Sequence, residues 1–269
     1  MNKYYDSDSK RVLFFGQRPD PSFWDAQWKH EKFSDRVRSR AYGNTRMPAV
    51  TKRFLPVLYA PRIFEGGCGD GHVVLALRNA GYDARGIDTA HETVSALHAH
   101  FPDLSIIEGD VRAIDFPDNY FQGYWSIGVI EHFQEGHDDI LDEMARVIAP
   151  GGYAFVSFPQ MSGFRRWKGR AGRYPPLSQR QNDEVFYQYA LRAEDVIADM
   201  ERRGFSLCMK KYQSRLKGLK DEVFFGKTIL SAVSEGRNIF WKVLRKISEY
   251  VLPPFFGHSV LLVMKKHDV

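Results

Sequence analysis

The strongest constraint in this sequence is a glycine-rich turn, Glu65-Gly66-Gly67-Cys68-Gly69-Asp70-Gly71, between an apolar segment and a helical one. Residues 62–65 predict a short buried strand, and residues 72–80 predict a helix that Gly81 ends. Glycines at such a junction allow a tight turn and a close approach of a ligand to the backbone. The pattern therefore predicts a ligand site at the carboxyl end of a parallel sheet.

The alternation of strand and helix continues along the chain. Further strands are expected at residues 84–88, 104–108, 124–130, 153–158, 205–209 and 258–265, and helices at 90–100, 138–148 and 194–203. Strands separated by helices of about ten residues predict an α/β fold, with a parallel sheet covered on both faces.

Composition is that of a soluble globular protein, with 43% hydrophobic residues, 26% charged residues and a net charge of +5. This mildly basic balance tolerates an anionic partner such as RNA, a phosphorylated sugar or a membrane surface, without requiring one. Cys68 and Cys208 have no metal-ligand spacing. With no apolar signal region and no apolar run near ~18 residues, we expect a cytoplasmic protein that could touch a membrane peripherally without crossing it.

These signals divide the chain into six expected segments. They are an N-terminal lid segment at 1–45, a cofactor-binding core at 46–160, a substrate-side insertion at 161–192, a core helix and strand at 193–213, a helical insertion at 214–256 and a closing strand at 257–269. The helical insertion contains a basic amphipathic stretch at 237–252. It could pack as a cap, form a dimer contact, or lie in a membrane interface with Trp241, Phe255 and Phe256.

The turn has the features of a nucleoside site but not of a dinucleotide site. Asp88 ends the next strand, where a carboxylate can accept hydrogen bonds from two ribose hydroxyls. The dinucleotide pattern G-x-G-x-x-G would need glycine at position 72, which is His72. Glu65 also disfavours a pyrophosphate, because its charge would repel phosphate but could pair with a cationic amino-acid head.

In combination, the motifs over residues 46–160 resemble those of class I S-adenosylmethionine-dependent methyltransferases of the bacterial small-molecule type. The matching motifs, in order, are Glu65-x-Gly67-x-Gly69-x-Gly71, Asp88, Gly109-Asp110-Val111, Tyr124-Trp-Ser-Ile-Gly-Val-Ile-Glu-His-Phe133 and Glu143-Met-Ala-Arg-Val-Ile-Ala-Pro-Gly-Gly152. Residues 257–266 resemble the closing strand of that family. The resemblance implies a Rossmann-like, seven-stranded, mostly parallel sheet with helices on both faces and an antiparallel last strand, plus helical insertions that form a cap.

The cofactor implied by this resemblance is S-adenosyl-L-methionine. By the same resemblance, Gly67, Cys68 and Gly69 would line its methionine part, Asp88 and Thr89 would hold the ribose, Asp110 and Val111 the adenine, and Ser126 and Ile127 would lie beneath the sulfonium. Glu65 and Gly71 complete the expected cofactor-binding set. Some related enzymes bind a metal through Glu-x-x-Glu-His at the fourth strand, but the first position here is Gly128, so no metal is expected.

Methyl transfer is an in-line displacement with a neutral leaving group, so the protein mainly positions the acceptor and excludes water. His132 is the candidate general base, because an imidazole titrates near neutrality. Glu131 and His132 could instead only orient a loop or the cofactor.

Several side chains are candidates for contact with the acceptor: Trp24, Trp28, Phe133, Arg165, Tyr174 and Tyr187. The two tryptophans share one helical face and could form a lid or simply pack. The tyrosines could line a pocket or pack the insertion. Arg165, in a basic run, could hold a phosphate or carboxylate or be solvated.

Three functions fit the sequence. A methyltransferase for a small-molecule, sugar or lipid-linked acceptor is favoured by the insertions, which could enclose a pocket. An RNA methyltransferase is compatible with the basic charge, but the chain has no added RNA-binding module and no Asn-Pro-Pro-Tyr motif after the fourth strand. The third is a non-catalytic protein that binds the cofactor. A homodimer is compatible with each.

Overall fold

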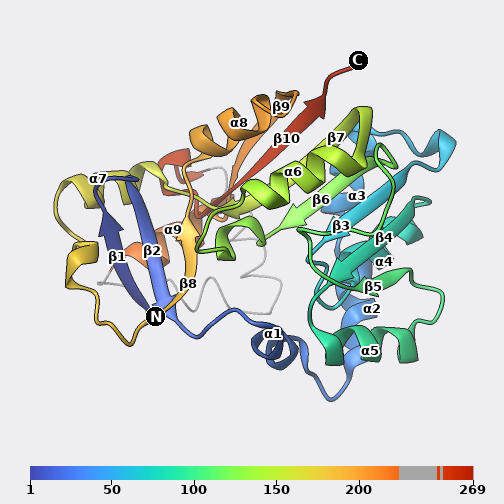
Figure 1. Ribbon diagram of the computed structural model, residues 1–269, viewed down its shortest axis with the longest axis horizontal. Coiled ribbons are helices and arrows are strands. Elements are labelled where there is room, and N and C mark those ends of the chain that lie inside the picture. The colour runs from blue at the N-terminus through green and yellow to red at the C-terminus, as the bar shows by residue number, and fades with distance from the viewer. Residues whose placement is uncertain (224–246, 249–250, 269) are drawn as a thin grey trace.

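The computed structural model describes residues 1–223, 247–248 and 251–268 (Figure 1). Its main sheet has seven strands in the order β5-β4-β3-β6-β7-β10-β9. The strands are β3 (Arg62–Gly66), β4 (Asp83–Asp88), β5 (Ile106–Glu108), β6 (Phe121–Ile127), β7 (Ile148–Pro159), β9 (Phe205–Gln213) and β10 (Ser259–Lys266). Strands β3 to β7 are parallel, and β10 pairs antiparallel with both β7 and β9. The expected Rossmann-like sheet with an antiparallel last strand is confirmed.

Helices cover both faces of this sheet, as the alternating sequence predicted. One face packs against α2 (Phe33–Gly43), α3 (Arg46–Phe54), α4 (His72–Asn79) and α5 (His91–His100), and the other against α6 (Asp138–Val147) and α8 (Ala193–Glu201). In α6, the buried residues Ile140, Leu141, Met144 and Val147 recur at helical spacing and form its sheet-facing stripe.

Several strand boundaries differ from the expectation, and the shift of β6 affects the site. The strand expected at 124–130 occupies 121–127 instead. It ends because Gly128 has a φ of +71°, which turns the chain into the 3₁₀ turn η2 (Ile130–His132). The shift places residues 128–135 beyond the carboxyl end of the sheet, where a ligand is expected.

A second, three-stranded antiparallel sheet is absent from the sequence-based prediction. It consists of β1 (Asn2–Asp6), β2 (Arg11–Gly16) and β8 (Val185–Ala190). Val12 and Phe14 pack in one small core and Leu13 and Phe15 in another, so both faces of β2 are buried. The expected lid segment and substrate-side insertion therefore share one structural unit.

The helix that carries Trp24 and Trp28 is α1 (Pro21–Trp28), which lies beside α5 (Figure 1). Asp20 caps it by accepting a hydrogen bond of 2.9 Å from the Phe23 backbone N–H. The Asp25 carboxylate in turn accepts hydrogen bonds of 2.8 Å from the backbone N–H and the hydroxyl of Thr93, in the first turn of α5. These contacts fix α1 against the core.

The remaining described elements are α7 (Gly163–Arg170), α9 (Arg215–Glu222) and the 3₁₀ turns η1 (Val57–Tyr59), η3 (Leu177–Gln179) and η4 (Pro254–Phe256). Most of the amphipathic stretch expected at 237–252, with Trp241, lies outside the described residues. Within the described part of the chain, no helix is long and apolar enough to cross a membrane.

A buried hydrogen bond ties α3 to the sheet and gives a first prediction. The Trp125 indole N–H donates to the Thr51 hydroxyl over 3.0 Å, and both side chains are buried. Thr51→Val leaves the indole N–H without a partner, so the free energy of unfolding in urea should fall by about 1–3 kcal/mol. Thr45→Val is the matched control, because Thr45 is exposed and makes no side-chain cap. Equal stability of the two variants would contradict the prediction.

Candidate active site

The glycine-rich turn between β3 and α4 has left-handed backbone angles at its glycines. Gly67, Gly69 and Gly71 have φ values of +68°, +53° and +69°. A Cβ on Gly67 would lie 2.6 Å from the Val129 side chain, and one on Gly69 would lie 2.5 Å from the Trp28 ring. The turn therefore needs glycine both for its backbone angles and for the close approach of its neighbours.

Asp88, at the end of β4, locks this turn. Its Oδ2 accepts a hydrogen bond of 2.6 Å from the Gly69 backbone N–H, and its Oδ1 accepts one of 2.9 Å from the Ala90 N–H. Burial raises the pKa of Asp88 above its ordinary value, although these hydrogen bonds partly offset that effect. The carboxylate keeps lone pairs available beside the pocket that it lines.

Glu65 precedes the turn and is 4% exposed. Burial, together with the charges of Asp70 and Asp88, raises its pKa well above the ordinary value. Among the described residues, its buried Oε2 has no hydrogen-bond partner. A buried carboxylate oxygen without a partner indicates a place where a cationic or hydrogen-donating ligand group would be stabilised.

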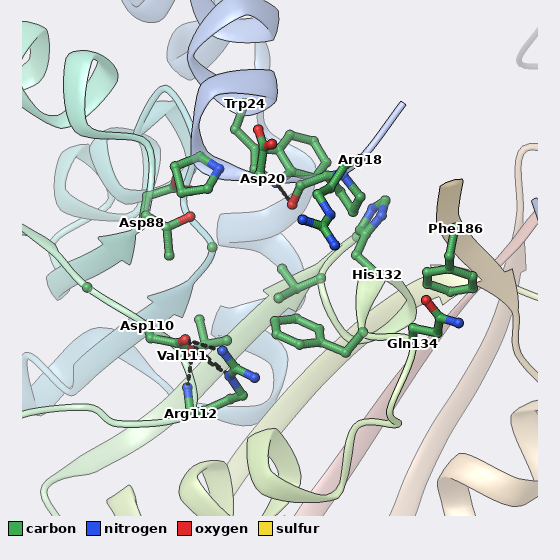
Figure 2. Close-up of a pocket in the computed structure, with 18 of the residues that line it drawn as sticks. Arg18, Asp20, Trp24, Asp88, Asp110, Val111, Arg112, His132, Gln134 and Phe186 are labelled. Carbon is green, nitrogen blue, oxygen red and sulfur yellow. Dashed lines mark hydrogen bonds and ion pairs between the residues drawn. The ribbon is translucent and has the colours of Figure 1, made fainter. Parts of the chain in front are cut away.

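Gly67 of the turn and Asp88 line a pocket of about 530 Å³ at the carboxyl end of the sheet (Figure 2). Figure 2 shows Asp88 and Asp110 on one side of it and His132, Gln134 and Phe186 on the other. Its lining includes seven candidates from the cofactor-binding and catalytic sets: Gly67, Asp88, Thr89, Asp110, Val111, Ile127 and His132. Trp24, Trp28 and Phe133 line it as well.

Five other residues predicted for the cofactor site lie outside the lining: Glu65, Cys68, Gly69, Gly71 and Ser126. Cys68 is buried beneath the turn, against Gly86 of β4. Gly69 and Gly71 shape the turn, and the buried Ser126 hydroxyl has no partner within the described chain. Cys68 therefore acts by packing; burial raises the pKa of its thiol well above the ordinary value, so it is no nucleophile.

Part of the lining was missed by sequence reasoning. The segment before α1 contributes Arg18, Pro19 and Asp20, the start of α1 contributes Pro21, and β8 contributes Val185 and Phe186. Asp20-Pro21 is a helix-start signal, an N-cap followed by proline, which places a turn just before Trp24. The β8 residues give no such signal, because only their pairing with β2 brings them to the pocket.

Asp110 lies where the resemblance predicts the adenine contact, but its carboxylate is engaged by Arg112. The Arg112 Nε donates to both carboxylate oxygens over 3.1 Å. Burial would raise the pKa of Asp110, and the hydrogen bonds from Arg112 outweigh it, so the pKa is lowered. Asp110 is therefore an ionised acceptor at the edge of the pocket.

His132 follows β6 and faces the pocket. Its Nδ1 lies 2.8 Å from the Tyr187 carbonyl, which only accepts, so Nδ1 carries the proton and Nε2 keeps a lone pair. Burial lowers the pKa of His132 to about 4. Its ring contacts Trp24 and Tyr187 edge-on, at centroid distances of 5.0 and 4.9 Å. Near neutrality it is an oriented, uncharged base.

Glu131 precedes this histidine in the chain and does not line the pocket. Burial raises the pKa of its carboxyl to about 8, and its Oε2 has no partner within the described chain. Its Oε1 is 3.9 Å from His132 Nε2. At pH 7 the two side chains are therefore mostly neutral, and not an ion pair.

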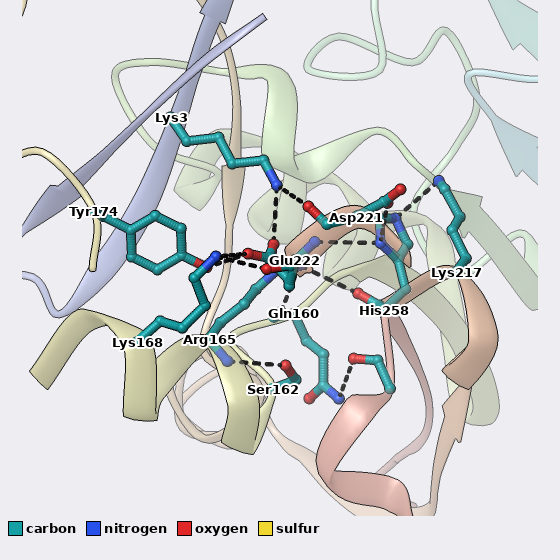
Figure 3. A network of polar contacts seen from close by, with 11 residues as sticks. Lys3, Gln160, Ser162, Arg165, Lys168, Tyr174, Lys217, Asp221, Glu222 and His258 are labelled. Carbon is teal, nitrogen blue, oxygen red and sulfur yellow. Dashed lines mark hydrogen bonds and ion pairs between the residues drawn. The ribbon is translucent and has the colours of Figure 1, made fainter. Parts of the chain in front are cut away.

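Two predicted acceptor contacts lie elsewhere. Arg165 is 1% exposed and donates to Glu222 Oε1 over 3.0 Å, and the Tyr174 hydroxyl donates to Glu222 Oε2 over 2.6 Å (Figure 3). Both belong to a buried ion-pair network and not to the pocket. The basic run gave no information on which of its side chains faces inward. Tyr187 lies behind His132 and not in the lining.

The residues present fit the implied cofactor. Asp88 at the end of β4 offers acceptor oxygens for a ribose, and Glu65 offers an unpartnered buried oxygen near the turn for an ammonium group. Val111 and Ile127 are apolar walls for a base and a thioether. In the described part of the chain, no cluster of three or more His, Cys, Asp or Glu could hold a metal ion.

Comparison with known proteins agrees with this geometry. Residues 64–156 match the family model of the methyltransferase domain. A probable S-adenosylmethionine-dependent methyltransferase of Mycolicibacterium smegmatis is 27% identical over 145 residues, which are 54% of this chain and 52% of the relative. A demethylmenaquinone methyltransferase of Bacillus licheniformis is 31% identical over 108 residues, 37% of this chain and 46% of the relative.

The fold comparison reaches further along the chain. The 1,6-didemethyltoxoflavin-N1-methyltransferase of Burkholderia thailandensis, solved with S-adenosylhomocysteine, superposes with a TM-score of 0.56 at 10% identity, over 100% of both chains. This chain spans about half the length of the curated relatives it matches. Over residues 64–156 the chain therefore matches a methyltransferase domain, and beyond that range its fold resembles that of solved methyltransferases.

The Asp88 contacts predict how the cofactor site responds to mutation. Asp88→Ala removes the acceptor of the Gly69 N–H and the expected ribose contact, so affinity for S-adenosylhomocysteine should fall at least about tenfold. Calorimetric titration of the purified protein measures this, with NAD as the non-binding comparison. Asp83→Ala, at the opposite end of β4, is the matched control. Unchanged affinity in Asp88→Ala, or binding of NAD alone, would refute the assignment.

Proposed function

We propose that this protein transfers a methyl group from S-adenosylmethionine to a small-molecule acceptor that enters beside His132. The observation that carries the proposal is one pocket with two ends. Gly67, Asp88 and Asp110 line the end that suits the cofactor, and His132 with Phe186 lines the other. A donor and an acceptor bound side by side in one pocket meet the main requirement of an in-line displacement.

The chain's own groups supply positioning and proton removal. The cofactor, when bound, supplies an electrophilic methyl group on a sulfonium. Trp24 and Phe133 exclude water from the space in front of His132, and His132 Nε2 can accept a proton from an acceptor hydroxyl or amine. Arg18, at the same end, can balance a negative charge on the acceptor.

The size and walls of the pocket support a small acceptor. About 530 Å³ lies within the range of small-molecule sites, and its acceptor end combines the aromatic side chains of Phe133 and Phe186 with polar ones such as Gln134. The names of similar proteins agree: one acts on demethylmenaquinone, another is a fatty-acid O-methyltransferase, and a third methylates 1,6-didemethyltoxoflavin. A nucleic-acid acceptor would need a wider, basic approach.

Radiolabel transfer tests the acceptor class. The protein is incubated with S-adenosylmethionine labelled in its methyl group and with either a small-molecule cell extract or total RNA. We expect label in the small-molecule fraction and none in nuclease-sensitive material, because the pocket accommodates only a small acceptor.

Label in RNA alone would replace the proposal by an RNA methyltransferase. Cofactor binding without label in any fraction would favour a non-catalytic binding protein. Asp88→Ala serves as the blank for label that arises without the cofactor site.

His132 can be tested once a labelled product is available. His132→Ala should lower kcat by about 10²–10⁴-fold, because it removes the base, while leaving affinity for S-adenosylhomocysteine unchanged. His267→Ala, at an exposed site bonded to Ser206, is the control. A parallel loss of cofactor affinity would assign His132 to cofactor orientation instead.

The pH dependence of the rate distinguishes titration of His132 from titration of its neighbour Glu131. The lowered pKa of His132, about 4, means that its basic form is present at neutral pH and is lost only as pH falls toward that value. The rate of methyl transfer by the wild-type protein should therefore be constant from about pH 5 to 7 and should fall at pH values below about 5. A decrease in rate centred near pH 6.5 would contradict this environment for His132.

A further inference from the structure

Helix α7 (Gly163–Arg170) has an unusual distribution of side chains. Arg165 is buried, at 1% exposed, whereas Trp167, two residues later, is 51% exposed. In a helix on a protein surface the arginine usually faces water and the tryptophan faces the core. Both the buried arginine and the exposed tryptophan of α7 therefore require a structural explanation.

The buried side of α7 is explained by an ion-pair network (Figure 3). Arg165 donates to Glu222 over 3.0 Å and to the Gln160 carbonyl over 2.8 Å. Lys168 and Lys3 add ion pairs of 2.9 and 3.0 Å to the same Glu222 carboxylate. These contacts fix α7 to α9 and to β1, so the outer face of the helix is held in one orientation.

The outer side carries a contiguous aromatic cluster. Phe164 and Trp167 stack with an interplanar angle of 4° at 5.7 Å, and Phe164 also contacts Phe255 and Phe256 at 5.9 and 5.2 Å. Phe255 is 43% exposed. We call Phe164, Trp167, Phe255 and Phe256 the aromatic step. Exposed aromatic groups that touch one another mark an interaction surface more strongly than scattered ones.

Positive charge follows the aromatic step along the chain. Arg170 and Arg173 follow Trp167 closely in the chain, are exposed, and make no side-chain ion pair with any other described residue. Arg166 is paired with Glu194 and Lys168 with Glu222, so these two charges are already compensated. The surface therefore combines exposed rings with two uncompensated guanidinium groups.

We propose that the aromatic step and its flanking Arg170 and Arg173 dock this protein onto an anionic phospholipid surface. Tryptophan and phenylalanine insert at the headgroup level, and arginine binds the lipid phosphates. The charge of this surface favours an anionic lipid over a second copy of the chain. In a symmetric contact between two copies, both surfaces would carry the same net positive charge, which disfavours their association. The inference is independent of the proposed catalytic activity.

Co-sedimentation with vesicles tests the proposal on the full chain. The protein should bind vesicles of phosphatidylcholine mixed with phosphatidylglycerol much more tightly than vesicles of phosphatidylcholine alone, and added salt should weaken the binding. Trp167→Ser combined with Phe255→Ser should weaken binding at least about tenfold by removing the inserted rings. Arg170→Glu combined with Arg173→Glu should weaken it at least about tenfold, and selectively on the anionic vesicles.

Leu58→Ser is the matched control, since Leu58 is an exposed apolar side chain that lies outside the aromatic step. Its binding should equal that of the wild type, and calorimetric binding of S-adenosylhomocysteine should be unchanged in every variant, which shows that each is folded.

Three results would overturn the proposal. The first is no binding to anionic vesicles, and the second is binding that the two double variants leave unchanged. The third is a dimer in light scattering that Trp167→Ser with Phe255→Ser converts to a monomer, which would assign the surface to a second copy. None of these results depends on methyl transfer.

Discussion

The hydrogen bond from the Gly69 N–H to Asp88 is the contact on which the rest of the site depends. It joins the ends of β3 and β4 and, with the Cys68 N–H bonded to the Ile87 carbonyl over 2.9 Å, sets the course of the turn. That course leaves room for the Trp28 ring directly over Gly69. A side chain at this glycine would displace both the turn and helix α1, so the core and α1 share one constraint.

The same turn concentrates negative charge. Glu65, Asp70 and Asp88 lie close enough to raise the pKa of Glu65. Asp70 is compensated by Arg40, which also lies over the Trp28 ring at 5.4 Å, but Glu65 keeps a buried oxygen without a partner in the described chain. A cationic ligand group would stabilise the charged form of Glu65, whereas these carboxyl groups would disfavour a pyrophosphate. Charge and backbone shape thus select the same class of nucleoside ligand.

Local sequence patterns were sufficient for the main sheet and for the glycine turn, because strand, turn and helix signals there involve neighbouring residues. The sheet of β1, β2 and β8 was not predicted, since Val12 pairs with Ala190 across most of the chain and no local pattern records that contact. Arg165 was misplaced for a related reason: its partner, Glu222, is distant in sequence, and a basic run does not reveal which member is buried.

The added sheet also influences the chemistry of the core. The family match ends at residue 156, yet β8 at 185–190 provides Val185 and Phe186 to the proposed acceptor end of the pocket. The next residue, Tyr187, accepts the hydrogen bond from His132 Nδ1. The strand that would contact the acceptor therefore also fixes which nitrogen of the core histidine carries a proton. Changes in β8 that suit a new acceptor would alter the orientation of the base as well, so acceptor choice and proton transfer would change together.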